Sequence, residues 1–319
     1  MPFSRNRQRV RRAVVLAAGY GTRLLPATKA QPKEALPLVD KPIIQYTVEE
    51  AAASGLTQVI IVTAAGKRAV EDHFDRSLEI EMALQEKGDL ARLEEIRHIS
   101  ELADIVYVRQ KEQRGIGDAV LTAKDVVGEE PFVLFFPDDV IVAEVPVARQ
   151  MLDVFDRYRA PIVAVEEVPV EEIESYGVVE PEMVEDGIFR VRSLVEKPTP
   201  QEAPSNLGIV GRYVLTPDIF DALTRTAPGK GREVQLTDGL ALLLERGPVY
   251  AYRFEGKRYD TGRPLGLLKA SVEIALRRPD IGPALRAYLR GLNLDEPGPG
   301  LQTGPRAEAP AGPLGQAGP

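Results

Sequence analysis

The sequence predicts an α/β fold, in which a mixed, mostly parallel sheet is flanked by helices. A strand is expected at residues 13–18 (AVVLAA), a helix at 43–54, and a second strand at 58–64 (QVIIVTA). Both strands are continuous apolar runs, which is typical of strands buried on both faces of a sheet. A helix between two such strands indicates a right-handed crossover between parallel neighbours. The expected architecture is therefore Rossmann-like.

The same alternation continues along the chain. The next expected elements are a strand at 104–109, a helix at 117–126, a strand at 132–136, a helix at 145–158 and a strand at 161–166. After Gly177 the strands are expected to be shorter, with a hairpin turn at Asp186 and Gly187. The last expected elements are a strand at 206–215 and helices at 217–223, 234–245, 262–276 and 283–289.

The domain organisation follows from three shifts in composition. Residues 1–12 are rich in arginine and are expected to form a basic arm, whereas residues 13–294 form a single domain. Within that domain, residues 71–101 are charged and helix-favouring, so a helical insertion is expected there. Residues 295–319 contain six glycines and six prolines, which predicts a disordered tail because such a composition cannot bury a core.

The overall composition excludes several classes of protein. The chain has no cysteine, which excludes disulfides and thiolate metal sites and favours a reducing cytoplasm. Its two histidines, His73 and His98, lie in the expected insertion and are interpreted as surface residues. A catalytic metal therefore needs oxygen ligands, which favour Mg²⁺ or Mn²⁺. The net charge of −8 argues against nucleic acid as a partner, and no apolar run is long enough to span a membrane.

A glycine-containing loop follows the first strand and predicts a phosphate site. Its sequence is Gly19-Tyr20-Gly21-Thr22-Arg23, at the edge of the sheet where such folds bind ligands. Leu24 stands where a dinucleotide fingerprint needs its third glycine, and no P-loop motif occurs. Arg23 and the nearby Lys33 add the positive charge that a triphosphate needs. The alternative is a tight turn with solvated loop charges.

Carboxylates after two later strands suggest a metal site. Asp138 and Asp139 follow an apolar strand, and Asp260 lies in the sequence RYDTG. Two carboxylates, together with phosphate oxygens and waters, suit octahedral Mg²⁺. Asp139 is interpreted as an orienting or solvated neighbour, with a ligand role left open. The commoner role of an aspartate at a strand end is to form a cap or turn.

Polar side chains at other strand ends could contact a base and a sugar. The Gln110 amide can both donate to and accept from a pyrimidine, and Gly115 would allow close approach. Glu196 can accept from two sugar hydroxyls, and Lys197 can pair with a sugar phosphate. Each could equally be an ordinary surface residue.

Residues 13–42 (AVVLAAGYGTRLLPATKAQPKEALPLVDKP) resemble the signature of the sugar-phosphate nucleotidyltransferase family. Within it they resemble the bacterial branch that joins UTP to glucose-1-phosphate. The resemblance extends from about Ala13 to about Leu292. It implies a nucleotide-diphospho-sugar transferase type of fold, a Mg²⁺ cofactor, UDP-glucose and pyrophosphate as products, and assembly as a homodimer or homotetramer.

The resemblance also implies roles for individual residues. The implied nucleotide-binding residues are Ala17, Ala18, Gly19, Gly21, Thr22, Glu34, Gln110 and Gly115. The implied sugar-phosphate residues are Gly177, Glu196, Lys197 and Asn206. Asp138 and Asp260 are implied as metal ligands. Arg23, Lys33 and Lys197 are the implied catalytic residues.

Three alternatives remain open at this point. The first keeps the reaction but uses dTTP, although the long signature and the helical insertion favour UTP. The second is a catalytically silent sugar-nucleotide sensor, which the intact charged residues argue against. The third is a nicotinamide-dependent oxidoreductase, which the missing third glycine argues against.

Overall fold

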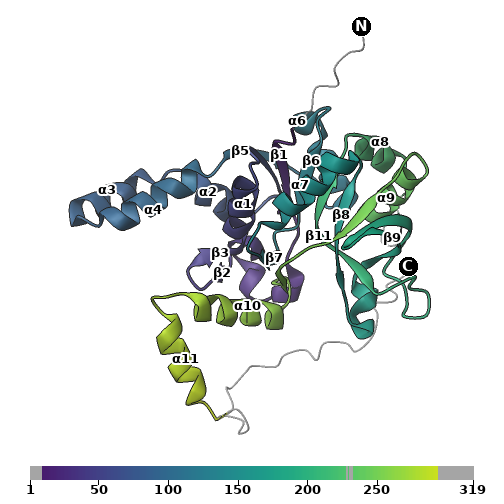
Figure 1. Ribbon diagram of the computed structural model, residues 1–319. Coiled ribbons are helices and arrows are strands. Elements are labelled where there is room, and N and C mark those ends of the chain that lie inside the picture. The colour runs from purple at the N-terminus through teal and green to yellow at the C-terminus, as the bar shows by residue number, and fades with distance from the viewer. Residues whose placement is uncertain (1–8, 228, 230–232, 294–319) are drawn as a thin grey trace, which may run out of the picture. The chain divides into compact units, whose positions relative to one another are not determined.

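The computed structural model describes residues 9–227, 229 and 233–293 (Figure 1). The chain divides into two compact units, Met1–Ile274 and Ala275–Pro319. Most of the expected arm at 1–12 and all of the expected tail at 295–319 lie outside the described residues. The assignment of arm, single domain and tail therefore stays a prediction.

A nine-stranded mixed sheet forms the centre of the first unit, in the order β5-β4-β1-β6-β11-β8-β12-β10-β9. The strands are β1 (Arg12–Leu16), β4 (Gln58–Thr63), β5 (Asp104–Arg109), β6 (Phe132–Phe135), β8 (Ile162–Glu167), β9 (Gly177–Glu185), β10 (Ile188–Glu196), β11 (Leu207–Leu215) and β12 (Tyr250–Arg253). Two small sheets pair β2 (Pro37–Leu38) with β3 (Lys41–Pro42), and β7 (Asp139–Val142) with β13 (Lys257–Asp260).

Only one half of the large sheet is parallel throughout. β1 pairs in parallel with β4 and β6, and β4 pairs in parallel with β5. In the other half, β11 runs antiparallel to β6 and β8, and β10 runs antiparallel to β12 and β9. The α/β class is confirmed, but the expectation of a mostly parallel sheet is not. The expectation of shorter strands after Gly177 is wrong for β9 and β10, which have nine residues each, whereas β11 matches the strand expected at 206–215.

Helices cover both faces of this sheet. The helices as far as residue 277 are α1 (Ile43–Ala53), α2 (Arg68–Phe74), α3 (Leu78–Lys87), α4 (Leu90–Glu101), α5 (Ile116–Thr122), α6 (Lys124–Val127), α7 (Val147–Tyr158), α8 (Asp218–Arg225), α9 (Leu236–Leu244) and α10 (Pro264–Arg277). Of these, α1 and α7 pack on one face, and α5, α8 and α9 pack on the other. Val14 of β1 belongs to the core shared with α5, α8 and α9, whereas Val15 belongs to the core shared with α1 and α7. Because successive side chains of a strand point to opposite faces, both faces must be apolar, and the strand reads as one apolar run.

The segment expected as a helical insertion contains most of α2 and all of α3 and α4. In Figure 1 the α3 and α4 pair projects away from the sheet. Glu81 of α3 accepts hydrogen bonds from Arg76 and Arg97, which lower its pKa to about 2. This ion cluster fixes the pair, because its apolar contacts are few. His98 is exposed, as expected, whereas His73 is half-buried and contacts Gln45.

The second unit is described in part. It contains the end of α10 and the helix α11 (Gly282–Arg290), where Arg286 donates a hydrogen bond to the carbonyl of Leu276 at 3.1 Å.

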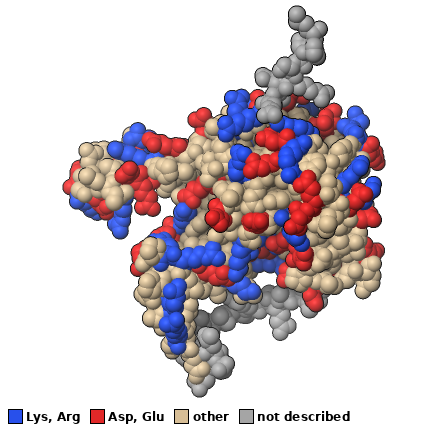
Figure 2. Space-filling model, viewed as in Figure 1, with Lys and Arg blue, Asp and Glu red and all other residues tan. Residues whose placement is uncertain are grey.

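Across the described residues of the whole chain, none of the helices has the length and apolar character that crossing a bilayer requires. Figure 2 shows acidic and basic side chains interspersed over the visible face of the molecule.

A buried arginine joins four elements behind the carboxyl edge of the sheet. Arg212 of β11 is 1% exposed and forms an ion pair with Glu50 of α1, with Nη2 2.6 Å from Oε2. It also donates to the carbonyl oxygens of Phe136 and Asp139, at 3.1 and 2.9 Å, in the turn between β6 and β7. Glu50 in turn accepts from the backbone N–H of Ala148 in the first turn of α7. Every charge in this cluster therefore has a partner.

Replacing Arg212 with methionine should destabilise the fold strongly. Glu50 would keep a buried charge with no cation, and the carbonyls of Phe136, Gly211 and Asp139 would each lose a donor. We expect the free energy of unfolding to fall by ~3–5 kcal/mol, measured by urea denaturation. Arg68→Met is the matched control, because Arg68 pairs with Asp72 on the surface of α2 and its loss should cost less than ~1 kcal/mol. Equal losses in the two variants would contradict the argument.

Candidate active site

A cleft with two lobes lies at the carboxyl edge of the sheet. The glycine-loop lobe is lined by Leu16, Ala18, Gly19, Tyr20, Gly21, Thr22, Lys33, Gln110, Gln113, Gly115, Ile116, Ala119, Phe136, Asp138 and Glu233. The Glu196 lobe is lined by Arg23, Ile116, Phe136, Asp138, Asp139, Ser175, Tyr176, Gly177, Glu196, Lys197, Ile209, Gly211, Tyr213, Gln235, Leu236, Thr237, Arg258, Asp260 and Arg263. The two lobes share Ile116, Phe136 and Asp138, so Asp138 stands where they meet.

The glycine loop has a fixed backbone. Gly21 has a φ of 67°, and a side chain there would come within 3.1 Å of Lys33 and 3.3 Å of Thr28. Glycine adopts this positive φ without strain, and it has no side chain that would collide with Lys33 or Thr28. The Thr28 hydroxyl donates to the carbonyl of Gly21 at 2.8 Å. Gly19, in contrast, has open space where a side chain would begin, so the backbone there can approach a ligand closely.

A buried ion pair supports the same loop from behind. Lys67 donates to the carboxylate of Glu34 at 2.7 Å and to the carbonyl of Gly19 at 2.6 Å. Both side chains are buried. Burial raises the pKa of Glu34, and the charge of Lys67 opposes that rise. Glu34 therefore acts on the loop through Lys67, and it does not line the cleft.

The opposite wall of the glycine-loop lobe follows the end of β5. Gln110 is 5% exposed, and its side-chain amide donates to Asp118 at 2.7 Å. Gln113 donates from its amide to the carbonyl of Ala18 at 2.5 Å, which links the two walls. Gly115 has a φ of 98°, and a side chain there would lie 2.8 Å from the carbonyl of Val234. The positive φ and the close carbonyl of Val234 therefore both require glycine at this position.

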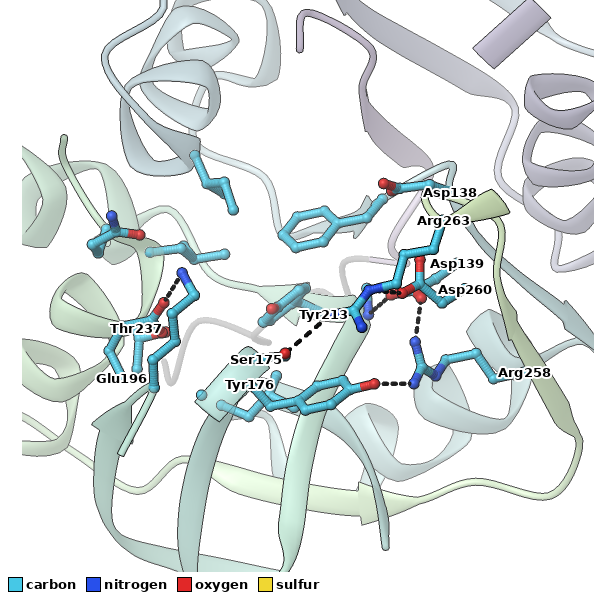
Figure 3. A pocket seen from close by; sticks show the side chains of 18 of the residues that line it. Asp138, Asp139, Ser175, Tyr176, Glu196, Tyr213, Thr237, Arg258, Asp260 and Arg263 are labelled. Carbon is cyan, nitrogen blue, oxygen red and sulfur yellow. Dashed lines mark hydrogen bonds and ion pairs between the residues drawn. The ribbon is translucent and has the colours of Figure 1, made fainter. Parts of the chain in front are cut away.

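One oxygen of Asp138 and one oxygen of Asp260 lie close to the same position beside Gly262; both aspartates are labelled in Figure 3. A side chain added at Gly262 would lie 2.9 Å from one oxygen of Asp138 and 3.1 Å from one oxygen of Asp260. The pairing of β13 with β7 brings them together, because it places Asp260 opposite Asp139. The backbone N–H and the hydroxyl of Thr261 both donate to the carbonyl of Asp138 at 2.8 Å.

Lys33 and Asp138 form an ion pair at the junction of the lobes. Nζ of Lys33 lies 2.5 Å from Oδ2 of Asp138. Burial by itself would lower the pKa of Lys33, but the charges of Asp138 and Glu34 raise it above its usual value. Burial would likewise raise the pKa of Asp138, but Lys33 holds it below its usual value. Both groups are therefore charged at neutral pH.

Arg258 connects Asp139 to the floor of the Glu196 lobe. It donates to Asp139 at 2.6 Å and to the hydroxyl of Tyr176 at 2.7 Å (Figure 3), and it also donates to Glu166 at 2.5 Å. The second oxygen of Asp139 accepts from the backbone N–H of Gly211 at 2.8 Å. Both oxygens of Asp139 are thus engaged within the protein, and so are those of Asp260, which accept from the N–H of Gly262 at 3.0 Å and pair with Arg263 at 3.3 Å. The orienting role of Asp139 stays a prediction.

Glu196 is held at the far end of its lobe. It accepts a hydrogen bond from the hydroxyl of Thr237 at 2.7 Å and pairs with Lys197 at 2.9 Å. A side chain at Gly177 would lie 3.2 Å from Glu196, so this glycine leaves room for the carboxylate. Lys197 has a φ of 47°, and its backbone N–H donates to the carbonyl of Tyr176 at 3.0 Å. An unusual backbone angle at a non-glycine residue is typical of functional sites.

The structure brings most of the predicted site residues into this cleft. Those that line it are Ala18, Gly19, Gly21, Thr22, Arg23, Lys33, Gln110, Gly115, Asp138, Gly177, Glu196, Lys197 and Asp260. Ala17, Glu34 and Asn206 are not among the lining residues. Ala17 is buried and donates to the carbonyl of Val62, whereas Asn206 is exposed and accepts from the backbone of Val168.

Sequence reasoning missed several residues of the cleft and its support, namely Lys67, Gln113, Asp118, Thr237, Arg258 and Arg263. For two of these residues, the position in the sequence could have indicated a place in the site. Lys67 follows β4 at the same edge of the sheet as the glycine loop, and Arg258 lies two residues before Asp260 in the motif RYDTG. The other residues can be assigned to the site only from their contacts in the three-dimensional structure.

Comparison with known proteins defines the class of this protein. The family model described as nucleotidyl transferase matches residues 12–276, and the chain belongs to this family.

Within the family, the chain is similar to uridylyltransferases. The UTP–glucose-1-phosphate uridylyltransferase of Staphylococcus epidermidis is 47% identical over 287 residues, which cover 90% of this chain and 100% of that protein. A UDP-glucose pyrophosphorylase solved in complex with UDP-glucose is 45% identical with a TM-score of 0.78, over 84% of this chain and 100% of the other. A UTP-bound UGPase from Acinetobacter baumannii is 38% identical with a TM-score of 0.83, over 89% and 99%.

Replacing Lys67 with methionine should make stability more sensitive to pH. Glu34 would lose its cation while staying buried, so its pKa in the folded state would rise further above the unfolded value. A raised pKa stabilises the fold only while the group is protonated, and this contribution is lost as pH rises. We therefore expect the free energy of unfolding of the variant to lie further below that of the wild type at about pH 8 than at about pH 5, measured by urea denaturation. Adding Glu34→Gln should remove this pH dependence, and an equal deficit at both pH values would contradict the argument.

Proposed function

We propose that this protein transfers a uridylyl group from UTP to glucose-1-phosphate, giving UDP-glucose and pyrophosphate. The observation that carries the proposal is the two-lobed cleft, whose lobes meet at Asp138. One lobe has a glycine loop with cations beside it, which suits a nucleoside triphosphate. The other has a carboxylate and a lysine at its far end, which suits a phosphorylated sugar. The high identity to uridylyltransferases over nearly the whole chain supports the same reaction.

The glycine-loop lobe would bind UTP. Backbone N–H groups near Gly19 and Gly21 can donate to phosphate oxygens, since open space lies beside Gly19. Lys33 and Arg23 supply positive charge at the junction of the lobes. Gln110 would contact the uracil base with its side-chain amide. Glu34 is proposed to assist the nucleotide through Lys67 and Gly19, without touching it.

The Glu196 lobe would bind glucose-1-phosphate. Glu196 can accept from sugar hydroxyls, and Thr237 fixes one of its two oxygens in place. Gly177 leaves the space that a sugar ring needs next to that carboxylate. Lys197 would turn from Glu196 to the sugar phosphate when the substrate is present. Asn206 is exposed outside the cleft, so its proposed role is limited to supporting the wall.

The chemistry requires positioning and charge neutralisation. An oxygen of the sugar phosphate attacks the α-phosphorus of UTP in line, and the bond from that phosphorus to the bridging oxygen breaks. Pyrophosphate leaves with the electron pair of that bond, and no covalent bond to the protein forms. Lys33, Arg23 and Lys197 would neutralise the phosphates as they approach, which supplies electrostatic stabilisation at the reacting centre.

The residues at the junction fit a magnesium ion. The oxygens of Asp138 and Asp260 converge on one point, and both are hard ligands. No group of three or more histidine, cysteine, aspartate or glutamate side chains suited to a metal occurs among the described residues. Phosphate oxygens and waters would therefore have to complete the coordination. When bound, Mg²⁺ supplies charge neutralisation and a template for the two phosphates.

Two further features remain proposals. A cytoplasmic location is supported by the absence of cysteine from the sequence. Assembly as a homodimer or homotetramer is supported only by the family resemblance. Among the competing functions, no contact made by the described residues of the cleft favours dTTP over UTP.

A matrix of substrates tests the proposed function. We expect pyrophosphate release to be fastest with UTP and glucose-1-phosphate, and to require a divalent ion. Replacing UTP by dTTP, CTP, ATP or GTP, or glucose-1-phosphate by other sugar 1-phosphates, should lower kcat/KM. Tight binding of UDP-glucose with no turnover for any pair would identify a sensor and refute the proposal.

Asp138→Asn and Asp260→Asn should each lower turnover by ~100-fold or more, equivalent to ~2.7 kcal/mol of barrier. Both changes keep the size of the side chain and remove its charge. If the two residues share one ion, the double variant should be little worse than either single variant. Circular dichroism should show an unchanged fold, and Asp125→Asn on the exposed side of α6 serves as the matched control. Multiplication of the two losses would contradict a shared ion.

A further inference from the structure

We infer that Asp118 is a specificity-determining residue, which fixes the side-chain amide of Gln110 so that its oxygen faces the base. The inference rests on the proposed function, in which Gln110 contacts the base of the nucleotide. Asp118 lies in the first turn of α5, and one of its carboxylate oxygens is 2.7 Å from Nε2 of Gln110. Asp118 does not line the cleft, so it acts through Gln110 as a positioning residue.

The orientation of the Gln110 amide follows from the chemistry of its partner. A charged carboxylate has no proton to donate, so only the NH₂ end of an amide can face it. The amide oxygen must then point away from Asp118. Among the described residues, no donor is bonded to that oxygen, and Gln110 lines the glycine-loop lobe. The oxygen is therefore available to accept a hydrogen bond from a ligand.

Both partners are held in place by backbone contacts. The backbone N–H of Gln110 donates to the carbonyl of Thr63 at 2.8 Å, which extends the pairing of β5 with β4. The N–H of Gly117 donates to the carbonyl of Val234 at 2.8 Å, which fixes the start of α5. The positive end of a helix dipole also favours a charged carboxylate in the first turn. Asp118 and Gln110 therefore keep their positions relative to each other.

A fixed amide oxygen distinguishes pyrimidines by their N3 atom. Uracil and thymine carry a proton on N3 and can donate it to Oε1 of Gln110. Cytosine has a lone pair on N3, which would face the same oxygen and repel it. A site that pairs a buried acceptor with a substrate N–H strongly rejects an analogue that lacks the proton. Asp118 should therefore select UTP over CTP, while leaving the choice between UTP and dTTP unaffected.

Asp118→Asn tests this directly. Asparagine has the same size but can donate as well as accept, so the Gln110 amide can turn over and offer its NH₂ end to cytosine. We expect the ratio of kcat/KM for UTP to that for CTP to fall by ~10-fold or more, equivalent to ~1.4 kcal/mol. The ratio of UTP to dTTP and the KM for glucose-1-phosphate should stay unchanged. A general loss of structure would change all of these together. Asp118→Ala, which removes the carboxylate that accepts from the Gln110 amide, should lower the same UTP-to-CTP ratio.

Two comparisons separate this inference from the proposed function. Asp125→Asn, an exposed aspartate on α6, should leave every ratio at the wild-type value. Gln110→Ala should lower the UTP-to-CTP ratio if Gln110 contacts the base. If Gln110→Ala lowers the ratio but both Asp118 variants keep it, the role of Asp118 is wrong and the proposed function stands. If Gln110→Ala also keeps the ratio, the assignment of Gln110 to the base is wrong, and the inference fails with it.

Discussion

The buried side chain of Arg212 is the constraint on which the rest of the site depends. A guanidinium group with 1% exposure must have all its partners inside the protein, because an unpaired buried charge is very costly. Its partners come from α1, from β11 itself and from the turn between β6 and β7. That turn carries Asp138 and Asp139. The position of the proposed metal site is therefore set by a charge that no substrate touches.

The same arrangement recurs at the other walls of the cleft. Three of the groups proposed to contact substrate are each held by a second charged or polar group behind them. Lys67 holds the carbonyl of Gly19, Asp118 holds the amide of Gln110, and Thr237 holds the carboxylate of Glu196. A reaction that relies on positioning needs groups that are already oriented before the substrates arrive. The supporting residues supply that orientation, although they take no part in bond making or breaking.

The antiparallel half of the sheet shows a limit of reading strands from a pattern. β11 is buried along all nine of its residues, as are β1, β4 and β6 of the parallel half along most of theirs. A continuous apolar run indicates burial on both faces, but it carries no information about the direction of the neighbouring strand. The direction depends on how the connections route the chain. The hairpin of β9 and β10 follows the turn expected at Asp186 and Gly187, whereas the antiparallel return of β11 beside β6 could not be predicted.

The sequence alone determined the α/β class, the positions of most strands of the large sheet although not of β12, and the residues at their carboxyl ends. These features are local, since they depend on apolar periodicity and on glycines and charges at fixed spacing after a strand. The tertiary structure alone decided which of these residues meet. Arg258 and Tyr176 are 82 positions apart in the chain, and Arg212 and Glu50 are 162 apart. No local pattern records such pairs, because a hydrogen bond depends on distance in space and not on separation along the chain.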